Sequence, residues 1–379
     1  MTFRLSDEHR AIRSAVREFG EREIRPVAAT YDAERRYPSD LIAQAADLDL
    51  VAPNIPTEYG GPGMDALGST IVTEELWRAD PGIGSAIGSR GFGTHMLLEF
   101  GADWMCEEWL PRIAAGQSAC ASAISEPAHG SDVAGMETTA VEDGDTWVID
   151  GVKTWITNGT IADVCVLFAK TDPGEGHRGI TAFLVPTETP GFTSEPIDNK
   201  LGIRASDLGT LYLDDVQIPT ENVIGAVNEG FYQLMEFFAV GRVSVAAHAV
   251  GVSQAAIDAA VAYATEREQF DRPISEFQAI RHKIADMATA TEAARSLTYR
   301  AAAAIEAGAD DEATRLASMA KLFASERAVE VADEGIQVHG GAGYVSDFPA
   351  ERYYRDARIT KIYEGTSEIQ RNIIADRIL

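Results

Sequence analysis

The segment Trp147-Val148-Ile149-Asp150-Gly151-Val152-Lys153-Thr154-Trp155-Ile156 decides the fold. Its apolar and β-branched residues predict strands, and Asp150-Gly151 matches the two-residue turn of a β-hairpin. Further strand candidates lie at 164–169, 180–185 and 210–213, separated by turns containing Gly and Pro. Because no long helix interrupts these strands, the pattern predicts an antiparallel β-barrel or sandwich over residues 118–227, and not a parallel sheet.

Helical periodicity lies on both sides of this β region. Apolar residues recur at helical spacing after Ser6, a good first residue for a helix, so residues 1–117 predict an all-α domain. Residues 228–379 contain long alanine-rich stretches without proline, such as 243–264 and 279–307. Long helices with short breaks between them favour a four-helix bundle. We therefore expect an α+β chain of three domains: 1–117, 118–227 and 228–379.

The charge balance limits the partners of the chain. Its 379 residues include 59 acids and 32 bases, for a formal net charge of −27. A basic surface for nucleic acid is not expected. Self-repulsion of this size favours a salty environment, because molar salt shortens the Debye length to ~3 Å. Lysine is scarce beside arginine, so we expect a halophilic protein rather than a merely acidic one.

Several features point to the cytoplasm. We find no apolar run of the ~18–20 residues that a membrane span needs, and the charged segment 3–10 does not suit a signal peptide. Cys106, Cys120 and Cys165 are dispersed and odd in number, which fits neither a disulfide framework nor a metal site. Gly82, Gly84 and Gly88 do not have the spacing of a dinucleotide-binding loop, so NAD is disfavoured.

A candidate catalytic carboxylate lies near the C-terminus, in the run Ile362-Tyr363-Glu364-Gly365-Thr366-Ser367-Glu368-Ile369-Gln370-Arg371. An apolar setting would raise the pKa of Glu364 toward neutral, as a general base requires. Gly365 lets a ligand or another backbone approach closely. The alternative is an exposed acid that caps the last helix.

Five other segments are rich in turn residues and polar side chains. The glycines of 337–344 suit a backbone wrapped around a phosphate or a ring edge, although a helix-to-helix turn uses glycine too. The others are 58–65, 125–132 together with 153–159, and 267–274 followed by Phe277-Gln278.

In this order and at these separations, the segments resemble the acyl-CoA dehydrogenase family over essentially the whole chain. The resemblance implies a three-domain fold, an FAD cofactor and an acyl-CoA substrate that is oxidised to the trans-2-enoyl-CoA. It also implies that electrons pass to an electron-transferring flavoprotein and that the chain forms a homotetramer, a dimer of dimers. An oxidase and a flavin-binding relative without activity remain alternatives, and the acyl chain length is open.

By resemblance, Glu364 abstracts the α-proton, flavin N5 accepts the β-hydride, and the Glu364 amide helps to bind the thioester carbonyl. Some relatives carry the base on the first long helix of the last domain, where this chain has Gly241. The substrate residues implied are Ser131, Arg242 and Gly365. Ala239 replaces an acid that contacts CoA in relatives. Arg90 either faces an acidic acyl tail or, as we favour, lies on the surface.

The resemblance also implies the cofactor residues. The flavin ring and part of the pyrophosphate are expected to contact Ser122, Ala123, Ile124, Ser125, Ser131, Trp155, Ile156 and Thr157. Alternatively, Trp155 is a core aromatic of the barrel. The FAD of a neighbouring subunit is expected to contact Arg267, Gln269, Phe270, Phe277, Gln278, Gln337, Val338, His339, Gly340 and Gly341. The adenosine end in the same subunit is expected to contact Thr366, Ser367 and Glu368.

Overall fold

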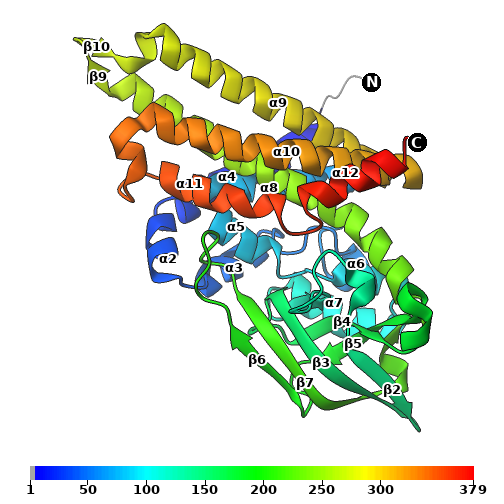
Figure 1. Cartoon of the computed structure of the whole chain (residues 1–379). Coiled ribbons are helices and arrows are strands. Elements are labelled where there is room, and N and C mark those ends of the chain that lie inside the picture. Colours follow the sequence, from blue (N-terminus) through cyan, green and yellow to red (C-terminus); the bar gives the residue numbers. More distant parts are fainter. Residues whose placement is uncertain (1–4) are drawn as a thin grey trace.

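The computed structural model describes residues 5–379, apart from the side chain of Asp310. Figure 1 shows a β domain that lies against the helices of the N-terminal part, with a bundle of long helices on their other side. The chain is thus helical, then β, then helical, as the change in periodicity predicts. This order places the loop before the last helix between the bundle and the rest of the molecule.

The N-terminal domain is built from short helices, and its first one begins as expected. The Ser6 side chain accepts a hydrogen bond of 3.0 Å from the amide of His9, which satisfies an open donor at the helix start. The helices are α1 (Asp7–Phe19), α2 (Ala28–Glu34), α3 (Ser39–Ala46), α4 (Ala66–Ala79), α5 (Pro81–Gly88), α6 (Thr94–Phe100) and α7 (Asp103–Ala114).

The middle domain is an eight-stranded sheet with the order β6-β7-β3-β2-β4-β5-β8, and β1 pairs with β4. Both halves of the sheet contribute side chains to one core, where Trp147 meets Phe183 edge to face. Most pairs are antiparallel, as predicted, but β1–β4 and the single pair joining β2 to β4 are parallel. The strands are β1 (Cys120–Ala123), β2 (Thr139–Asp143), β3 (Thr146–Thr157), β4 (Val164–Lys170), β5 (Ile180–Pro186), β6 (Phe192–Pro196), β7 (Leu208–Pro219) and β8 (Val223–Ile224).

The predicted hairpin turn at Asp150-Gly151 is wrong. Strand β3 runs through these residues, and the turn joins Asp143 to Thr146 instead. At Gly151 the register with β7 shifts, and a Cβ there would lie 2.4 Å from Oγ1 of Thr138. Asp-Gly therefore forms a bulge that brings the strand close to its neighbour, a use of glycine that the sequence does not separate from a turn.

The C-terminal domain is an antiparallel bundle of three long helices, with two short helices in the fourth position. The short helices α11 and α12 pack along α10, and α11 also contacts α8. A small hairpin of β9 (Glu268–Gln269) and β10 (Arg272–Pro273) joins α8 to α9. The helices are α8 (Gly230–Glu266), α9 (Gln278–Glu306), α10 (Asp310–His339), α11 (Ala350–Ala357) and α12 (Ser367–Asp376).

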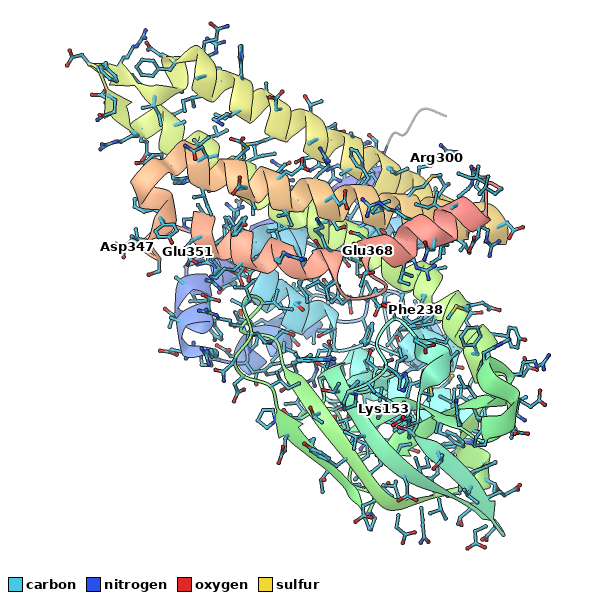
Figure 2. All side chains as sticks on the ribbon, viewed as in Figure 1. Lys153, Phe238, Arg300, Asp347, Glu351 and Glu368 are labelled. Atoms are coloured by element: carbon cyan, nitrogen blue, oxygen red, sulfur yellow. The ribbon has the colours of Figure 1, made fainter. Side chains whose placement is uncertain are left out.

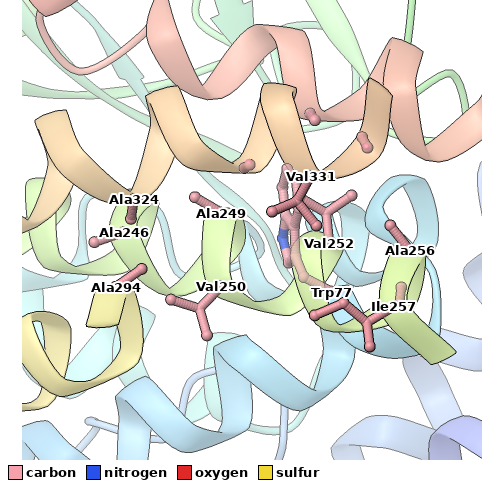
Figure 3. Close-up of a cluster of buried hydrophobic side chains, with 14 of the residues drawn as sticks. Trp77, Ala246, Ala249, Val250, Val252, Ala256, Ile257, Ala294, Ala324 and Val331 are labelled. Carbon is pink, nitrogen blue, oxygen red and sulfur yellow. The ribbon is translucent and has the colours of Figure 1, made fainter. Parts of the chain in front are cut away.

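Alanine lets the long helices approach one another closely. Figure 3 shows Ala246, Ala249 and Ala324 between helices, with Trp77 of α4 inserted beside α8. Within residues 5–379, only α8 is long and apolar enough to cross a membrane by length and composition, and 67% of its apolar window is buried inside the protein. Its apolarity is therefore explained by its place at the centre of the bundle.

Candidate active site

Glu364 lies in a strained turn between the end of α11 and α12. Its φ is +53° and that of Gly365 is +85°, so two successive residues have left-handed backbone. Such a conformation costs about 1–3 kcal/mol for a residue other than glycine and persists only where neighbours impose it. Gln370 donates through Nε2 to the carbonyls of Glu364 (3.1 Å) and Gly365 (3.0 Å). Lys321 donates to the same Gly365 carbonyl.

Glu364 is partly buried, and one oxygen of its carboxylate is shielded from water. Its Oε2 is buried and has no hydrogen-bond partner in the described part of the chain. It lies over Gly241 of α8, where an added Cβ would be only 2.6 Å away. Burial raises the pKa of Glu364 to about 7, and the nearby charges of Arg242 and Lys321 oppose the rise. The group is therefore able to take up a proton near neutral pH.

Arg242, predicted to bind substrate, lies beside this carboxylate and is only 4% exposed. Its Nε has no hydrogen-bond partner among residues 5–379, and its guanidinium lies 5.7 Å from the ring centre of Phe238. Burial lowers the pKa of Arg242 to about 10, against the opposing charge of Glu364. The structure thus joins Arg242 and Gly365 to Glu364, whereas Ser131 is exposed on a loop of the middle domain.

The residue before Glu364 is also anchored, by side chains that the sequence did not single out. The hydroxyl of Tyr363 lies 2.8 Å from Nδ1 of His248, within hydrogen-bonding distance. His248 stacks on Trp77 with 4.1 Å between the ring centres. Burial lowers the pKa of His248 to about 3, so the ring stays neutral. Tyr363 is therefore fixed from α8 and, through His248, from α4.

A second group of predicted residues meets in the middle domain. The Thr154 amide donates to the Ser125 carbonyl (2.9 Å), which joins the segment 122–125 to the segment 155–157. Trp155 is 62% exposed and has a φ of +61°, so the barrel-core interpretation of this residue is wrong. The side chains of Ala123, Ile124 and Ile156 pack inside hydrophobic cores, which leaves their main-chain atoms for any cofactor contact.

A buried ion pair supports this second group, and sequence reasoning missed its role. Nζ of Lys153 lies 2.8 Å from Oε1 of Glu126 and 3.1 Å from the Ile124 carbonyl. The amide of Thr138 also donates to Glu126. Lys153 holds the pKa of Glu126 down to about 2. Figure 2 shows Lys153 among the strands of the middle domain. A lysine inside a segment of strand-forming residues was the available signal.

A third group lies at the far end of the bundle, away from the middle domain (Figure 1). Phe270 is 86% exposed, and Arg267, Gln269 and Gln278 are exposed beside it, while Phe277 is half-buried. Gln337, Gly340 and Gly341 are exposed at the end of α10. One chain alone does not bring this group to Ser125 and Trp155.

Two residues of this group have side chains that are buried in the bundle and do not face solvent. Val338 is buried in the bundle core, and His339 is buried against Tyr263, with its Nδ1 2.7 Å from the Gly335 carbonyl. Because the last turn of α10 faces inward at these positions, only the main-chain atoms of both residues are left for any cofactor contact. The glycines after them form a 3-10 turn toward α11, as the turn interpretation of this segment predicts.

The remaining predicted residues lie near the start of α12. Thr366 caps this helix by accepting from the Ile369 amide (3.4 Å), and Glu368 is exposed. Ser367 is buried, and its Oγ lacks a partner in the described residues. Arg90 is not on the surface as favoured: it is 9% exposed and donates to the Gly116 carbonyl (3.0 Å), which leaves it a structural role.

Comparison with known proteins identifies the family. The N-terminal, middle and C-terminal domain models of acyl-CoA dehydrogenase match residues 6–117, 121–216 and 228–379. The rat (Rattus norvegicus) mitochondrial short-chain specific acyl-CoA dehydrogenase is 42% identical over 377 residues, which cover 99% of this chain and 91% of the relative. This chain belongs to the acyl-CoA dehydrogenase family.

Solved structures agree with this assignment. The butyryl-CoA dehydrogenase of Megasphaera elsdenii has a TM-score of 0.95 at 36% identity, with 99% of each chain covered. A glutaryl-CoA dehydrogenase of Mycobacterium smegmatis in complex with FADH2 has a TM-score of 0.92 at 30% identity, with 98% and 94% covered. The predicted fold class and the prediction of an oxidoreductase are confirmed, as is FAD as the cofactor.

The residues of this acyl-CoA dehydrogenase fit a flavin. The Trp155 side chain is largely exposed near Ser125, and Glu364 and Ser367 each carry a buried oxygen without a partner within the described chain. These two oxygens are therefore free to accept hydrogen bonds from a bound ligand. No group of three potential metal ligands occurs in the described residues.

Proposed function

We propose that this enzyme oxidises an acyl-CoA thioester to the trans-2-enoyl-CoA with Glu364 as the base. The observation that carries the proposal is the buried Oε2 of Glu364, which lacks a partner in residues 5–379, on a carboxyl whose pKa is raised to about 7. No carboxylate can replace it from α8, because the facing position is Gly241. An ionised oxygen in a dry setting is a strong proton acceptor.

In this mechanism, Oε2 of Glu364 takes the α-proton of the thioester. The turn that holds Glu364 fixes the direction of its carboxylate, and the buried setting limits competition from water. The Glu364 amide donates to the thioester carbonyl, where negative charge develops; one such donor contributes ~3–4 kcal/mol to lowering the barrier. Bound FAD supplies the acceptor for the β-hydride. Arg242 stabilises the ionised form of Glu364 that begins the step.

We propose that the FAD site is shared between two subunits of a homotetramer built as a dimer of dimers. Ser125, Trp155 and Thr157 would hold the flavin in one subunit, with Thr366 and Glu368 toward the adenosine end. The partner subunit would contribute the exposed group at the end of its bundle, including Arg267 and Phe270. Support comes from the exposure of Phe270, a large aromatic side chain that the single chain leaves almost uncovered.

Four finer expectations belong to the same proposal. Domain boundaries fall at 117/118 and 227/228; the latter lies between the end of β8 at Ile224 and the start of α8 at Gly230. Electrons pass to an electron-transferring flavoprotein. The protein is cytoplasmic, and its net charge of −27 reflects a halophilic source. Acyl-CoAs of increasing length, straight and branched, would define the substrate.

The test is Glu364→Gln. The variant should retain FAD and bind acyl-CoA but lose anaerobic bleaching of the flavin by orders of magnitude, because the amide cannot accept the α-proton. Glu142→Gln, at an exposed position of β2 outside the proposed site, is the matched control and should bleach normally. Near-normal bleaching by Glu364→Gln would overturn the assignment. Reoxidation by the flavoprotein partner, and not by air, would separate a dehydrogenase from an oxidase.

A further inference from the structure

Lys321 is a fully buried lysine on α10, and the reason for its burial is found at the active-site turn. Its Nζ lies 2.5 Å from the carbonyl oxygen of Gly365. No salt bridge joins it to an acid within residues 5–379. A buried ammonium without a paired carboxylate is costly, so a purely structural role is a poor explanation.

The backbone that Lys321 holds is the strained one. Glu364 and Gly365 both have positive φ, and the Gly365 carbonyl receives two donors, Nζ of Lys321 and Nε2 of Gln370. Gln370 belongs to α12, the helix that follows the turn, whereas Lys321 belongs to α10. Lys321 therefore ties the turn to the rigid bundle from outside its own segment.

The charge of Lys321 also acts on the carboxylate. The charged groups that bear on this site are Arg242 from α8, Lys321 from α10, Glu364 itself, and Glu368 and Arg377 from the C-terminal segment. Arg242 and Lys321 favour the ionised form of Glu364. Burial lowers the pKa of Lys321 to about 8, so the ammonium form still dominates at pH 7.

We propose that Lys321 is a positioning residue for the catalytic base: by donating to the Gly365 carbonyl it holds the left-handed turn that aims Glu364 over Gly241. The proposal rests on the function proposed for Glu364 and assigns its supporting group. Lys321 acts through the turn and does not itself touch the reacting atoms.

The first test replaces Lys321 by methionine, which keeps an unbranched side chain but removes the donor and the charge. Anaerobic flavin reduction at pH 7 should slow by about tenfold or more, since loss of one charged hydrogen bond corresponds to ~1.5–3 kcal/mol. Acyl-CoA affinity, measured by spectral titration, should change much less. The midpoint of the pH–rate profile should move to higher pH, because Glu364 loses a stabilising cation.

Lys200→Met is the matched control. Lys200 is also largely buried, donates to a backbone carbonyl, that of Ser206, and has its pKa lowered by burial to about 8. It belongs to the loop between β6 and β7, and among the described residues no hydrogen bond joins its side chain to the Glu364 turn. Its replacement should leave the pH midpoint unchanged even if it lowers the melting temperature.

Lys321→Gln separates the hydrogen bond from the charge and guards against a methionine variant that does not fold. The glutamine amide can still donate, so reduction at high pH should recover toward the wild-type rate while the midpoint stays raised. Hydrogen exchange of residues 362–372 gives a readout without turnover: it should speed up in Lys321→Met, where the turn loses its tie to α10, and much less in Lys321→Gln.

Wild-type reduction, an unshifted midpoint and unchanged exchange in folded Lys321→Met would overturn the proposal. A lower melting temperature with the wild-type midpoint would do so as well, because it shows a structural role alone. Neither result contradicts the assignment of Glu364 as the base, which is tested separately by Glu364→Gln.

Discussion

Gly241 of α8 lies directly against the carboxylate of Glu364, where a Cβ would approach Oε2 to 2.6 Å. Two chain segments that are far apart in the sequence thus share one small volume. A side chain at residue 241 and the carboxylate of Glu364 cannot both occupy it without movement. The glycine is therefore part of the site, although it carries no chemistry.

Gly241→Ala should lower flavin reduction by about tenfold or more, because the methyl group displaces the base from its attack position. The fold should survive, since alanine in a helix interior is favoured over glycine by ~1 kcal/mol. Rapid-mixing reduction and thermal melting measure the two effects. Gly88→Ala on α5 is the control, as its added Cβ meets nothing within 4 Å among the described residues. Equal activity of both variants would contradict the close contact.

The rate of reduction should rise with pH through about 7, the pKa to which burial raises Glu364. The base must be ionised to accept a proton, so activity grows from pH 6 to pH 8 in proportion to the ionised fraction. A pH–rate profile with substrate at limiting concentration reads this value in the free enzyme. A profile that is flat over this range would contradict a base that titrates near neutrality.

The raised pKa of Glu364 also predicts how stability depends on pH, and here the effect of rising pH is unfavourable. Glu364 binds its proton more tightly in the folded state than in the unfolded state, so its contribution is fully present below pH ~4.5 and is lost as pH rises through about 7. Glu364→Gln cannot ionise. The variant should therefore gain melting temperature relative to the wild type at pH 8 and gain less at pH 5.

Breaking the Lys153–Glu126 pair should destabilise the middle domain. Lys153→Met leaves Glu126 buried without its cation, at a cost of ~3–5 kcal/mol. The loss should appear in urea unfolding and as weaker FAD retention, because the pair supports the loop that carries Ser125. Adding Glu126→Gln to this variant should recover part of the stability.

The matched control for this pair is Lys283→Met. Lys283 pairs with Glu334 in a partly exposed setting, where an ion pair contributes ~0–1 kcal/mol. If both methionine variants lose the same small amount of stability, the buried pair does not support the loop as argued.

Local signals in the sequence were sufficient to predict most helices and strands, but not to predict which of their side chains are buried. The Ser6 cap and the long proline-free helices follow from rules that act within one turn or one helix. The hairpin turn was wrongly predicted at Asp150-Gly151, because glycine occurs in turns and in bulges alike. The sequence did not decide whether Trp155 lies in the core or on the surface, because the alternation of buried and exposed residues along a strand fails where a residue has positive φ, as Trp155 does.

The candidate site divides in the same way. Glu364 could be predicted because its motif is contiguous, from Tyr363 to Thr366. Lys321 and His248 could not, because each becomes relevant only when its helix packs against a turn more than forty residues away in the sequence. The burial of the Val338 and His339 side chains could not be predicted either, because the rotation of α10 in the bundle decides which side of its last turn faces solvent.

Arg267→Ala should weaken FAD retention without unfolding the subunit, because Arg267 is exposed at the hairpin end of the bundle. Gel filtration with absorbance at the flavin band would show cofactor loss, and dilution of the wild type should release FAD as subunits separate. Arg300→Ala is the control. Arg300 is exposed at the other end of α9, where it pairs with Glu312 of α10, and this variant should retain FAD. A stable monomer that holds one FAD per chain would contradict a shared site.

Thermal stability should increase from dilute buffer to molar KCl. The chain carries 59 acids against 32 bases, and like charges 4 Å apart repel by ~1 kcal/mol even in bulk water. Salt shortens the Debye length from ~10 Å at 0.1 M to ~3 Å at 1 M, which relieves the compact folded state more than the expanded unfolded chain. FAD adds the negative charge of its pyrophosphate, so the cofactor should be lost early on desalting. Asp143→Asn with Asp145→Asn, in the exposed turn before β3, should raise the melting temperature in dilute buffer and reduce its dependence on KCl. A melting temperature that stays constant across the salt range, with flavin retained, would show that the acidic surface is not a salt adaptation.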